Sequence, residues 1–178
     1  MKAIKLLIGA LFIATSISAQ SNYAKDPESC TSIMVGKKAT TDGSVITSHT
    51  CDSWYRTWVD MVPAQKYERD TTMAIYDGRM HTEFVSDQTK MTVKGEIPQV
   101  KQTYAFMDTS YPCMNEKQLG IGETTITGKK ELVNKNGMFM IEELQRVALQ
   151  RCTTAREAIL LMGELIKKYG YADSGECL

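Results

Sequence analysis

The 178-residue sequence has no excess of either charge and no basic run. Lysine and arginine total 21, and aspartate and glutamate also total 21. The absence of a basic cluster argues against nucleic acid as a partner. The sequence also contains no internal repeat and no low-complexity segment, so its length predicts about one globular domain.

Long apolar runs are missing as well, and the strongest apolar segment lies at the N-terminus. Lys2 and Lys5 precede an apolar stretch over residues 6–14, and small residues follow at 16–19. This pattern predicts a secretory signal over residues 1–19. A membrane span needs roughly 20 apolar residues. We therefore expect export to the periplasm or the exterior without a stable membrane anchor, a retained anchor being the alternative.

A cysteine follows soon after this signal. Residues 20–29 separate the signal from Cys30, whereas a lipoprotein signal would place its cysteine directly after the apolar run. We therefore interpret residues 20–29 as a short propeptide and residues 30–178 as the domain. Cleavage after Ser29 would leave the α-amine of Cys30 beside its own thiol. An α-amine has a pKa near ~7.7–8.0, so it would act as a base that activates the thiol. A buried or disulfide-bonded Cys30 is the alternative.

The residues after Cys30 predict a β-hairpin. Residues 31–35 and 45–50 have strand character, and Asp42-Gly43 is the strongest turn signal between them. A longer loop places Cys30 opposite Cys51, and a two-residue turn places it opposite Tyr55. Either register returns residues 49–55 to Cys30, so His49 and Asp52 are its nearest titratable candidates.

The other cysteines leave two interpretations open. Two disulfides in any of three pairings are possible in an exported chain, and buried free thiols are the alternative. These residues are Cys51, Cys113, Cys152 and Cys177. A zinc site would use His49, Cys51, Asp52 and His81, but their spacing matches no standard zinc pattern. We therefore expect no metal and no cofactor.

The remaining sequence predicts a mixed α+β domain. Residues 54–63 are aromatic-rich, and Trp54 is a candidate substrate contact or core residue. Residues 66–98 predict loops and edge strands, and 104–107 and 119–122 predict short strands. Apolar residues recur at helical spacing from Ile141, and Thr154 with Glu157 predicts a capping box that opens a second helix. Gly170 predicts its end, and residues 174–178 approach a further strand.

Four segments together resemble a known family. The sequence is similar to the cysteine dipeptidases related to dipeptidase A, which are N-terminal nucleophile hydrolases like penicillin V acylase and bile-salt hydrolase. The matching segments are CTSIMVGKKATTDGS at 30–44, IPQV at 97–100 with Tyr104, MNEKQLGIGETT at 114–125, and ALQRCTTAREA at 148–158 running on to 169–171 and 175–176.

The resemblance implies a four-layer αββα fold and a cysteine peptidase that hydrolyses dipeptides or short peptides. Cys30 matches the nucleophile. Asp52 matches the acidic residue that contacts the nucleophile's amine, and Asn115 matches an asparagine whose side chain helps form the oxyanion hole. Turn-forming roles for Asp52 and Asn115 are the alternatives from the residues themselves.

Two departures from the family pattern bear on function. Relatives commonly carry arginine where this chain has His49, and histidine titrates near ~6.5 while arginine stays charged. His49 is therefore a candidate substrate contact or a satisfied strand histidine. Family members also run well beyond residue 178, so we expect an N-terminal portion of the fold. An amidase or acylase acting on a non-peptide amide, and an inactive truncated member of the fold, are the alternative functions.

Overall fold

A computed structural model describes residues 30–52, 55–126 and 128–177, with side chains through residue 175. The predicted signal and propeptide, and the candidate residue Trp54, lie outside the described residues. The strands are β1 (Ser32–Val35), β2 (Ile46–His49), β3 (Asp60–Val62), β4 (Thr72–Asp77), β5 (Thr92–Pro98), β6 (Phe106–Asp108), β7 (Met114–Asn115), β8 (Thr124–Ile126) and β9 (Gly175–Cys177). The helices are α2 (Ile141–Arg151) and α3 (Ala155–Tyr169), with short 3-10 turns η1 (Arg79–His81) and η2 (Lys130–Leu132).

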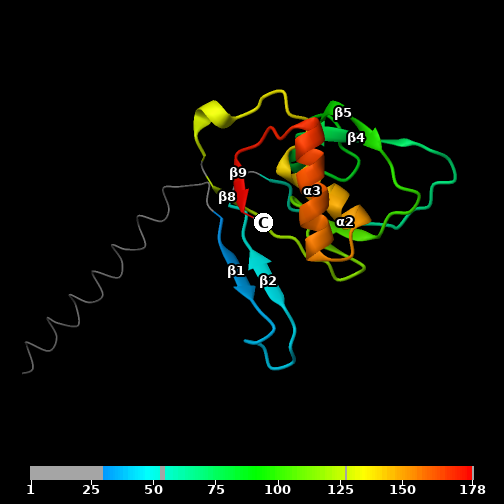
Figure 1. Cartoon of the computed structure of the whole chain (residues 1–178). Coiled ribbons are helices and arrows are strands. Elements are labelled where there is room, and N and C mark those ends of the chain that lie inside the picture. The colour runs from blue at the N-terminus through cyan, green and yellow to red at the C-terminus, as the bar shows by residue number, and fades with distance from the viewer. Residues whose placement is uncertain (1–29, 53–54, 127, 178) are drawn as a thin grey trace, which may run out of the picture.

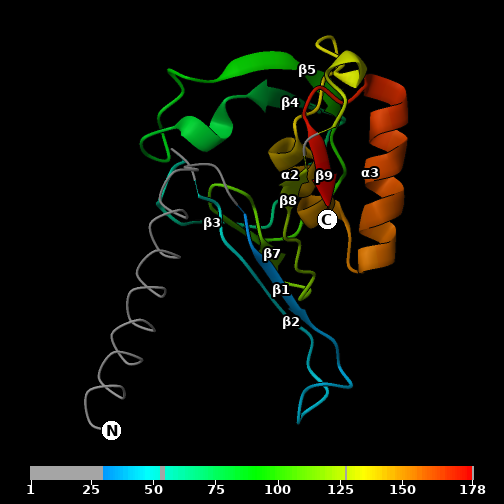
Figure 2. The same cartoon turned by 90° about the vertical axis from the view of Figure 1, so that its left-hand side faces the viewer.

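The strands form four small antiparallel sheets rather than one large one. The sheets pair β1 with β2, β4 with β5, β8 with β9, and β3 with β6 and β7. Helices α2 and α3 lie together beside these sheets, and the β1–β2 hairpin extends away from them (Figures 1 and 2). This arrangement confirms a mixed α+β domain, while the four-layer αββα arrangement stays a prediction.

The β1–β2 hairpin takes the longer-loop register. Ser32 lies opposite His49, and Val35 lies opposite Ile46. Facing positions therefore sum to 81, the register in which Cys30 is opposite Cys51. The alternative that would place Tyr55 opposite Cys30 is wrong, because the loop uses residues 36–45 rather than Asp42-Gly43 alone.

Two short strand predictions need correction. Residues 119–122 form only an isolated antiparallel bridge, Gly120 with Met114, rather than a strand. The bridge is made by two backbone bonds, from Asn115 N to Leu119 O at 3.0 Å and from Ile121 N to Cys113 O at 2.9 Å. A positive φ of 63° at Gln118 makes the turn between the bridged residues possible. The strand expected at 104–107 is shifted to Phe106–Asp108. Within 66–98, predicted as loops and edge strands, β4 and β5 form a hairpin with a bulge at Ile75/Tyr76.

Helices α2 and α3 follow the sequence prediction closely. The apolar side chains of α2 from Ile141 through Ala148 are buried in the core. Thr154 caps α3 by accepting from Glu157 N, and the Glu157 side chain bonds the Thr154 backbone in return. Gly170, at φ 80°, ends the helix in a conformation that favours glycine. Helix α3 therefore begins and ends where the sequence signals predicted, and α2 supplies a large part of the buried core.

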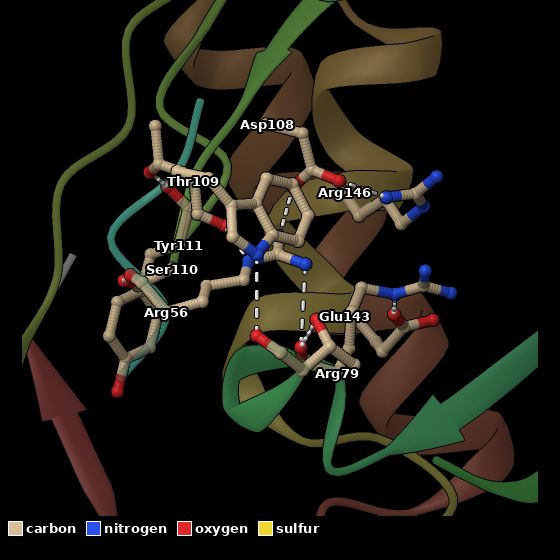
Figure 3. Close-up of polar contacts among 10 residues, drawn as sticks. Arg56, Arg79, Asp108, Thr109, Ser110, Tyr111, Glu143 and Arg146 are labelled. Atoms are coloured by element: carbon tan, nitrogen blue, oxygen red, sulfur yellow. Dashed lines mark hydrogen bonds and ion pairs between the residues drawn. The ribbon is translucent and has the colours of Figure 1, made fainter. Parts of the chain in front are cut away.

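A buried ion network joins α2 to strand β6 and turn η1 (Figure 3). Asp108 bonds Arg56 and Arg146, each at 2.7 Å, and Arg79 bonds Glu143 at 2.5 Å. The Arg56 and Asp108 side chains are only 2% and 6% exposed. Buried charges need such pairing, because an isolated buried ion is strongly unfavourable. These ion pairs therefore hold α2 against β6 and η1.

No helix in the described ranges has the length and apolarity that crossing a membrane would require.

Candidate functional site

Cys30 lies one residue beyond the paired strands of the β1–β2 hairpin. Thr50 N donates to Thr31 O at 2.9 Å, so the ladder continues one pair past Ser32 and His49. The return bond from Thr31 N goes to Thr50 Oγ1 at 3.2 Å rather than to the backbone. Cys30 is therefore held at the end of a defined ladder, half-buried.

One face of this hairpin carries four chemically active side chains. Side chains alternate between the two faces of a strand, and directly opposed residues share a face. The register therefore places four residues on the same face: Cys30, Ser32, His49 and Cys51. The two cysteines and the histidine are thus grouped by the backbone alone.

The segment 122–124 covers this face. A Cβ added at Gly122 would lie 2.9 Å from His49 Nδ1, so the histidine ring packs directly on the glycine. The Cys51 thiol lies 3.9 Å from Glu123 Oε1, and Ser32 Oγ is hydrogen-bonded to Thr124 Oγ1. Three consecutive residues of one segment therefore contact three residues of the cysteine-bearing face.

Glu123 is a site residue that the sequence analysis missed. It lies in the matched segment 114–125, but nothing in the sequence marked it as buried. It is 1% exposed, and its Oε2 has no hydrogen-bond partner in the part of the chain that the structure describes. A buried carboxylate oxygen without a hydrogen-bond partner is uncommon in folded proteins, and this one lies beside the Cys51 thiol.

Asp52 lies at the open end of the hairpin and is exposed. Its Oδ2 accepts from Thr50 Oγ1 at 3.2 Å, and Thr50 Oγ1 accepts from Thr31 N. This chain of bonds holds the carboxylate near the start of β1, where a free Cys30 amine would be created. Contact between Asp52 and that amine stays a prediction.

Asn115 uses its whole side-chain amide in the fold. Its Nδ2 donates to Leu149 O at 2.8 Å and to Cys152 O at 2.9 Å. Its Oδ1 accepts from Lys117 N and Leu119 N at 3.0 and 3.1 Å. Both N–H groups and both acceptor positions are thus engaged, as the turn-forming alternative expects. An oxyanion role would require one N–H to leave its carbonyl, and this role stays a prediction.

A polar cavity of about 360 Å³ opens beyond the covering segment. Tyr55 and Tyr111 form its aromatic wall, with ring centroids 5.5 Å apart at 77°. Burial, a hydrogen bond with Tyr55 and the charges of Glu123 and Cys51 raise the pKa of Tyr111 above its usual range. Because Cys51 and Glu123 act on Tyr111, the cavity adjoins the cysteine-bearing face.

Glu142 lies in the wall of this cavity. It is 1% exposed, and neither carboxylate oxygen has a hydrogen-bond partner among the described residues. Burial raises the pKa of its carboxyl to about 8, and the nearby charges of Glu143, Asp173 and Asp77 act in the same direction. The sequence did not signal this burial, because Glu142 and Glu143 are charged and lie off the apolar face of the predicted helix.

A second cavity, of about 330 Å³, is apolar and lies between the hairpin and α3. It is lined by residues such as Met34, Ile46, Ile121 and Met162. Ile121, Gly122 and Thr124 line this apolar cavity, and the next residue, Thr125, lines the polar one.

The described residues include no group of three side chains arranged to hold a metal ion, so the zinc alternative gains no support. Cys30, Cys113 and Cys152 are free cysteines. Burial raises the pKa of the Cys113 and Cys152 thiols. Cys152 is thus a buried free thiol, as the second sequence interpretation expects, while Cys113 is free and half-buried.

Comparison with known proteins gives the family. The model of peptidase family C69 matches residues 29–177. A probable dipeptidase of Latilactobacillus sakei is 27% identical over 160 residues, which cover 81% of this chain and 31% of that protein. The chain thus spans about a third of the length of that curated relative. No solved structure gives a significant match. Since the family match covers almost the whole described domain, the chain belongs to peptidase family C69.

Proposed function

We propose that the chain is the nucleophile-bearing part of an exported cysteine dipeptidase, with Cys30 as the first residue after propeptide removal. The observation that carries the proposal is the family match, which begins at residue 29, beside Cys30. The relative described as a probable dipeptidase supports the choice of short peptides as substrates.

The chemistry is acyl transfer through the Cys30 thiolate. The thiolate attacks the scissile carbonyl, and the α-amine of Cys30 takes the thiol proton and later gives it to the leaving amine. Water then hydrolyses the acyl-enzyme and restores the thiol. Asp52, held by Thr50, accepts a hydrogen bond from the Cys30 ammonium and keeps it oriented.

His49 shares the face of Cys30 and lies against Gly122. In this position it contacts substrate rather than the amine. The polar cavity beside Tyr55 and Tyr111 offers space for the substrate side chain.

The first test is intact mass and N-terminal sequencing of the secreted product. A mature chain that begins at Cys30 is the expected result, followed by hydrolysis of dipeptides that Cys30→Ser abolishes. A stable product that begins at residue 20 would contradict the mechanism, because Cys30 would then lack a free amine. Hydrolysis of acylated amino acids or bile conjugates in place of dipeptides would favour the acylase alternative.

A further inference from the structure

The face of the hairpin that carries Cys30 also carries a second thiol. Thr31 and Thr50 lie directly opposite each other, and Thr50 N donates to Thr31 O. They occupy a hydrogen-bonded position of the ladder, although the return bond from Thr31 N goes to Thr50 Oγ1, and such positions alternate with non-hydrogen-bonded ones along an antiparallel ladder. The next pair outward, Cys30 and Cys51, is therefore of the second kind, in which opposed side chains approach most closely.

This geometry suits a disulfide. Opposed Cα atoms in a non-hydrogen-bonded pair are about 4.5 Å apart, and a disulfide accepts Cα separations of roughly 4.4–6.8 Å. The Cβ atoms of such a pair need to close by about 1 Å. β1 begins at Ser32 and β2 ends at His49, so Cys30 and Cys51 lie outside the paired residues, where the backbone can adjust.

We propose that Cys30 and Cys51 form a cross-strand disulfide when the chain meets a thiol oxidant such as glutathione disulfide, and that this bond blocks the Cys30 thiol. Formation of the bond is independent of the proposed function. Only the loss of hydrolysis that follows from it rests on Cys30 being the nucleophile.

The exchange needs no group beyond the named oxidant. The Cys30 thiolate attacks one sulfur of glutathione disulfide and releases one glutathione thiolate. The Cys51 thiolate then attacks the Cys30 sulfur of the mixed disulfide and releases the second glutathione. The two protein thiols lose two electrons and two protons in total, and glutathione disulfide is reduced to two glutathione molecules.

Other cysteines are less suited to this reaction. Burial raises the pKa of Cys113 and Cys152, which lowers their thiolate fraction and their reactivity. Cys177 lies in β9 opposite Thr124, within the strand pair beside the covering segment. The experiment must therefore distinguish a disulfide that uses Cys177 from the proposed disulfide between Cys30 and Cys51.

The experiment is a disulfide map of the purified chain. The reduced chain is incubated with glutathione disulfide, free thiols are blocked with iodoacetamide, and the product is digested with trypsin without reductant. We expect the peptide that contains Cys30, residues 30–37 in the mature chain or 26–37 where the propeptide remains, linked to peptide 39–56, which contains Cys51. The intact chain should be about 2 Da lighter than its reduced form.

Matched variants sharpen the result. Cys113→Ser should leave the linked pair intact, while Cys51→Ser should lose it and accumulate a glutathione adduct on Cys30 instead. A link from peptide 39–56 to 169–178 would overturn the proposal in favour of Cys177. A stable glutathione adduct on Cys30 in the unaltered chain would overturn it as well, because Cys51 would then not reach Cys30.

Activity separates this inference from the proposed function. If the linked pair forms and dipeptide hydrolysis falls at least tenfold until dithiothreitol is added, both are supported. Full hydrolysis by the linked chain would contradict Cys30 as the nucleophile and leave the disulfide itself established. Normal hydrolysis with no linked pair under oxidation would remove the inference and leave the function standing.

Discussion

The side chain of Asn115 bonds the carbonyl of Cys152, the residue that ends helix α2, at 2.9 Å. Its second N–H bonds Leu149 O, so one side chain joins the turn after β7 to the end of the helix. The amide is 5% exposed, and these bonds are therefore shielded from water. Asn115 closes the fold at the point where the resemblance to acylases would place an oxyanion donor.

Replacing Asn115 by alanine should therefore destabilise the domain. The change leaves two buried carbonyls and two backbone N–H groups without their partner, and each such group costs about 1–3 kcal/mol. We expect a loss of at least ~3 kcal/mol in the free energy of unfolding, measured by urea denaturation. Asn134→Ala is the control, because Asn134 is exposed and its side chain makes one bond, to Asn136 N. Unchanged stability with a fall in kcat would instead favour the oxyanion role.

Asp108 should be similarly sensitive, for an electrostatic reason. Asp108→Asn leaves the guanidinium groups of Arg56 and Arg146 buried without a carboxylate. Breaking such a pair costs about 3–5 kcal/mol. The unfolding temperature, measured by thermal denaturation, should therefore fall. Asp70→Asn removes the exposed pair with Lys101 and should cost no more than ~1 kcal/mol. Equal effects of the two variants would contradict the role of burial.

The buried carboxyl of Glu142 should make stability depend on pH. Its pKa is about 8 in the fold, above its ordinary value, so between pH 5 and pH 8 the folded chain holds a proton that the unfolded chain has released. Stability should therefore fall as pH rises through this window, by up to about 1.4 kcal/mol per pH unit.

Urea denaturation at several pH values measures this slope. Glu142→Gln should flatten it and raise stability at pH 8, because the amide carries no charge. Glu164→Gln, an exposed change on α3, should leave the slope intact. A slope that persists in Glu142→Gln would assign the effect to Asp77, Asp173, Glu143 or His81, which lie nearby.

Gly122 offers a way to move His49 without altering it. A Cβ at position 122 would lie 2.9 Å from His49 Nδ1, closer than side chains tolerate, so Gly122→Ala should displace the ring. If His49 contacts substrate, KM should rise several-fold while the fold persists by circular dichroism. Gly128→Ala is the control, because a Cβ there meets nothing within 4 Å. An unchanged KM in Gly122→Ala would contradict a substrate contact by His49 and favour a structural role.

Local signals in the sequence predicted the local structure well. The α3 helix followed from its capping box and Gly170, and the start of α2 followed from its apolar spacing. The sequence of the hairpin was compatible with two registers. The structure has the one with the longer loop, over residues 36–45. The strand expected at 119–122 is reduced to a bridge between Gly120 and Met114. The Asn115 side chain accepts from Leu119 N and holds the tight turn before it, a contact that no periodicity reveals.

The site was predictable only where it is local in sequence. The β1–β2 hairpin returns residues 49–52 to the neighbourhood of Cys30, as the two strand segments and the turn between them predicted. Glu123 and Glu142 became visible only once distant segments were packed together. Their burial depends on contacts with residues tens of positions away, and polar residue types at those positions suggested exposure instead.

The β1–β2 hairpin has one further consequence. It consists of two strands of four residues each, most of whose side chains are exposed. A two-stranded ribbon of this kind is marginal on its own, so its amides should exchange with deuterium far sooner than those of α2. The proposed nucleophile thus lies on a part of the described domain that should open more readily than α2. Protection of residues 31–50 from exchange would report directly on whatever binds or covers Cys30.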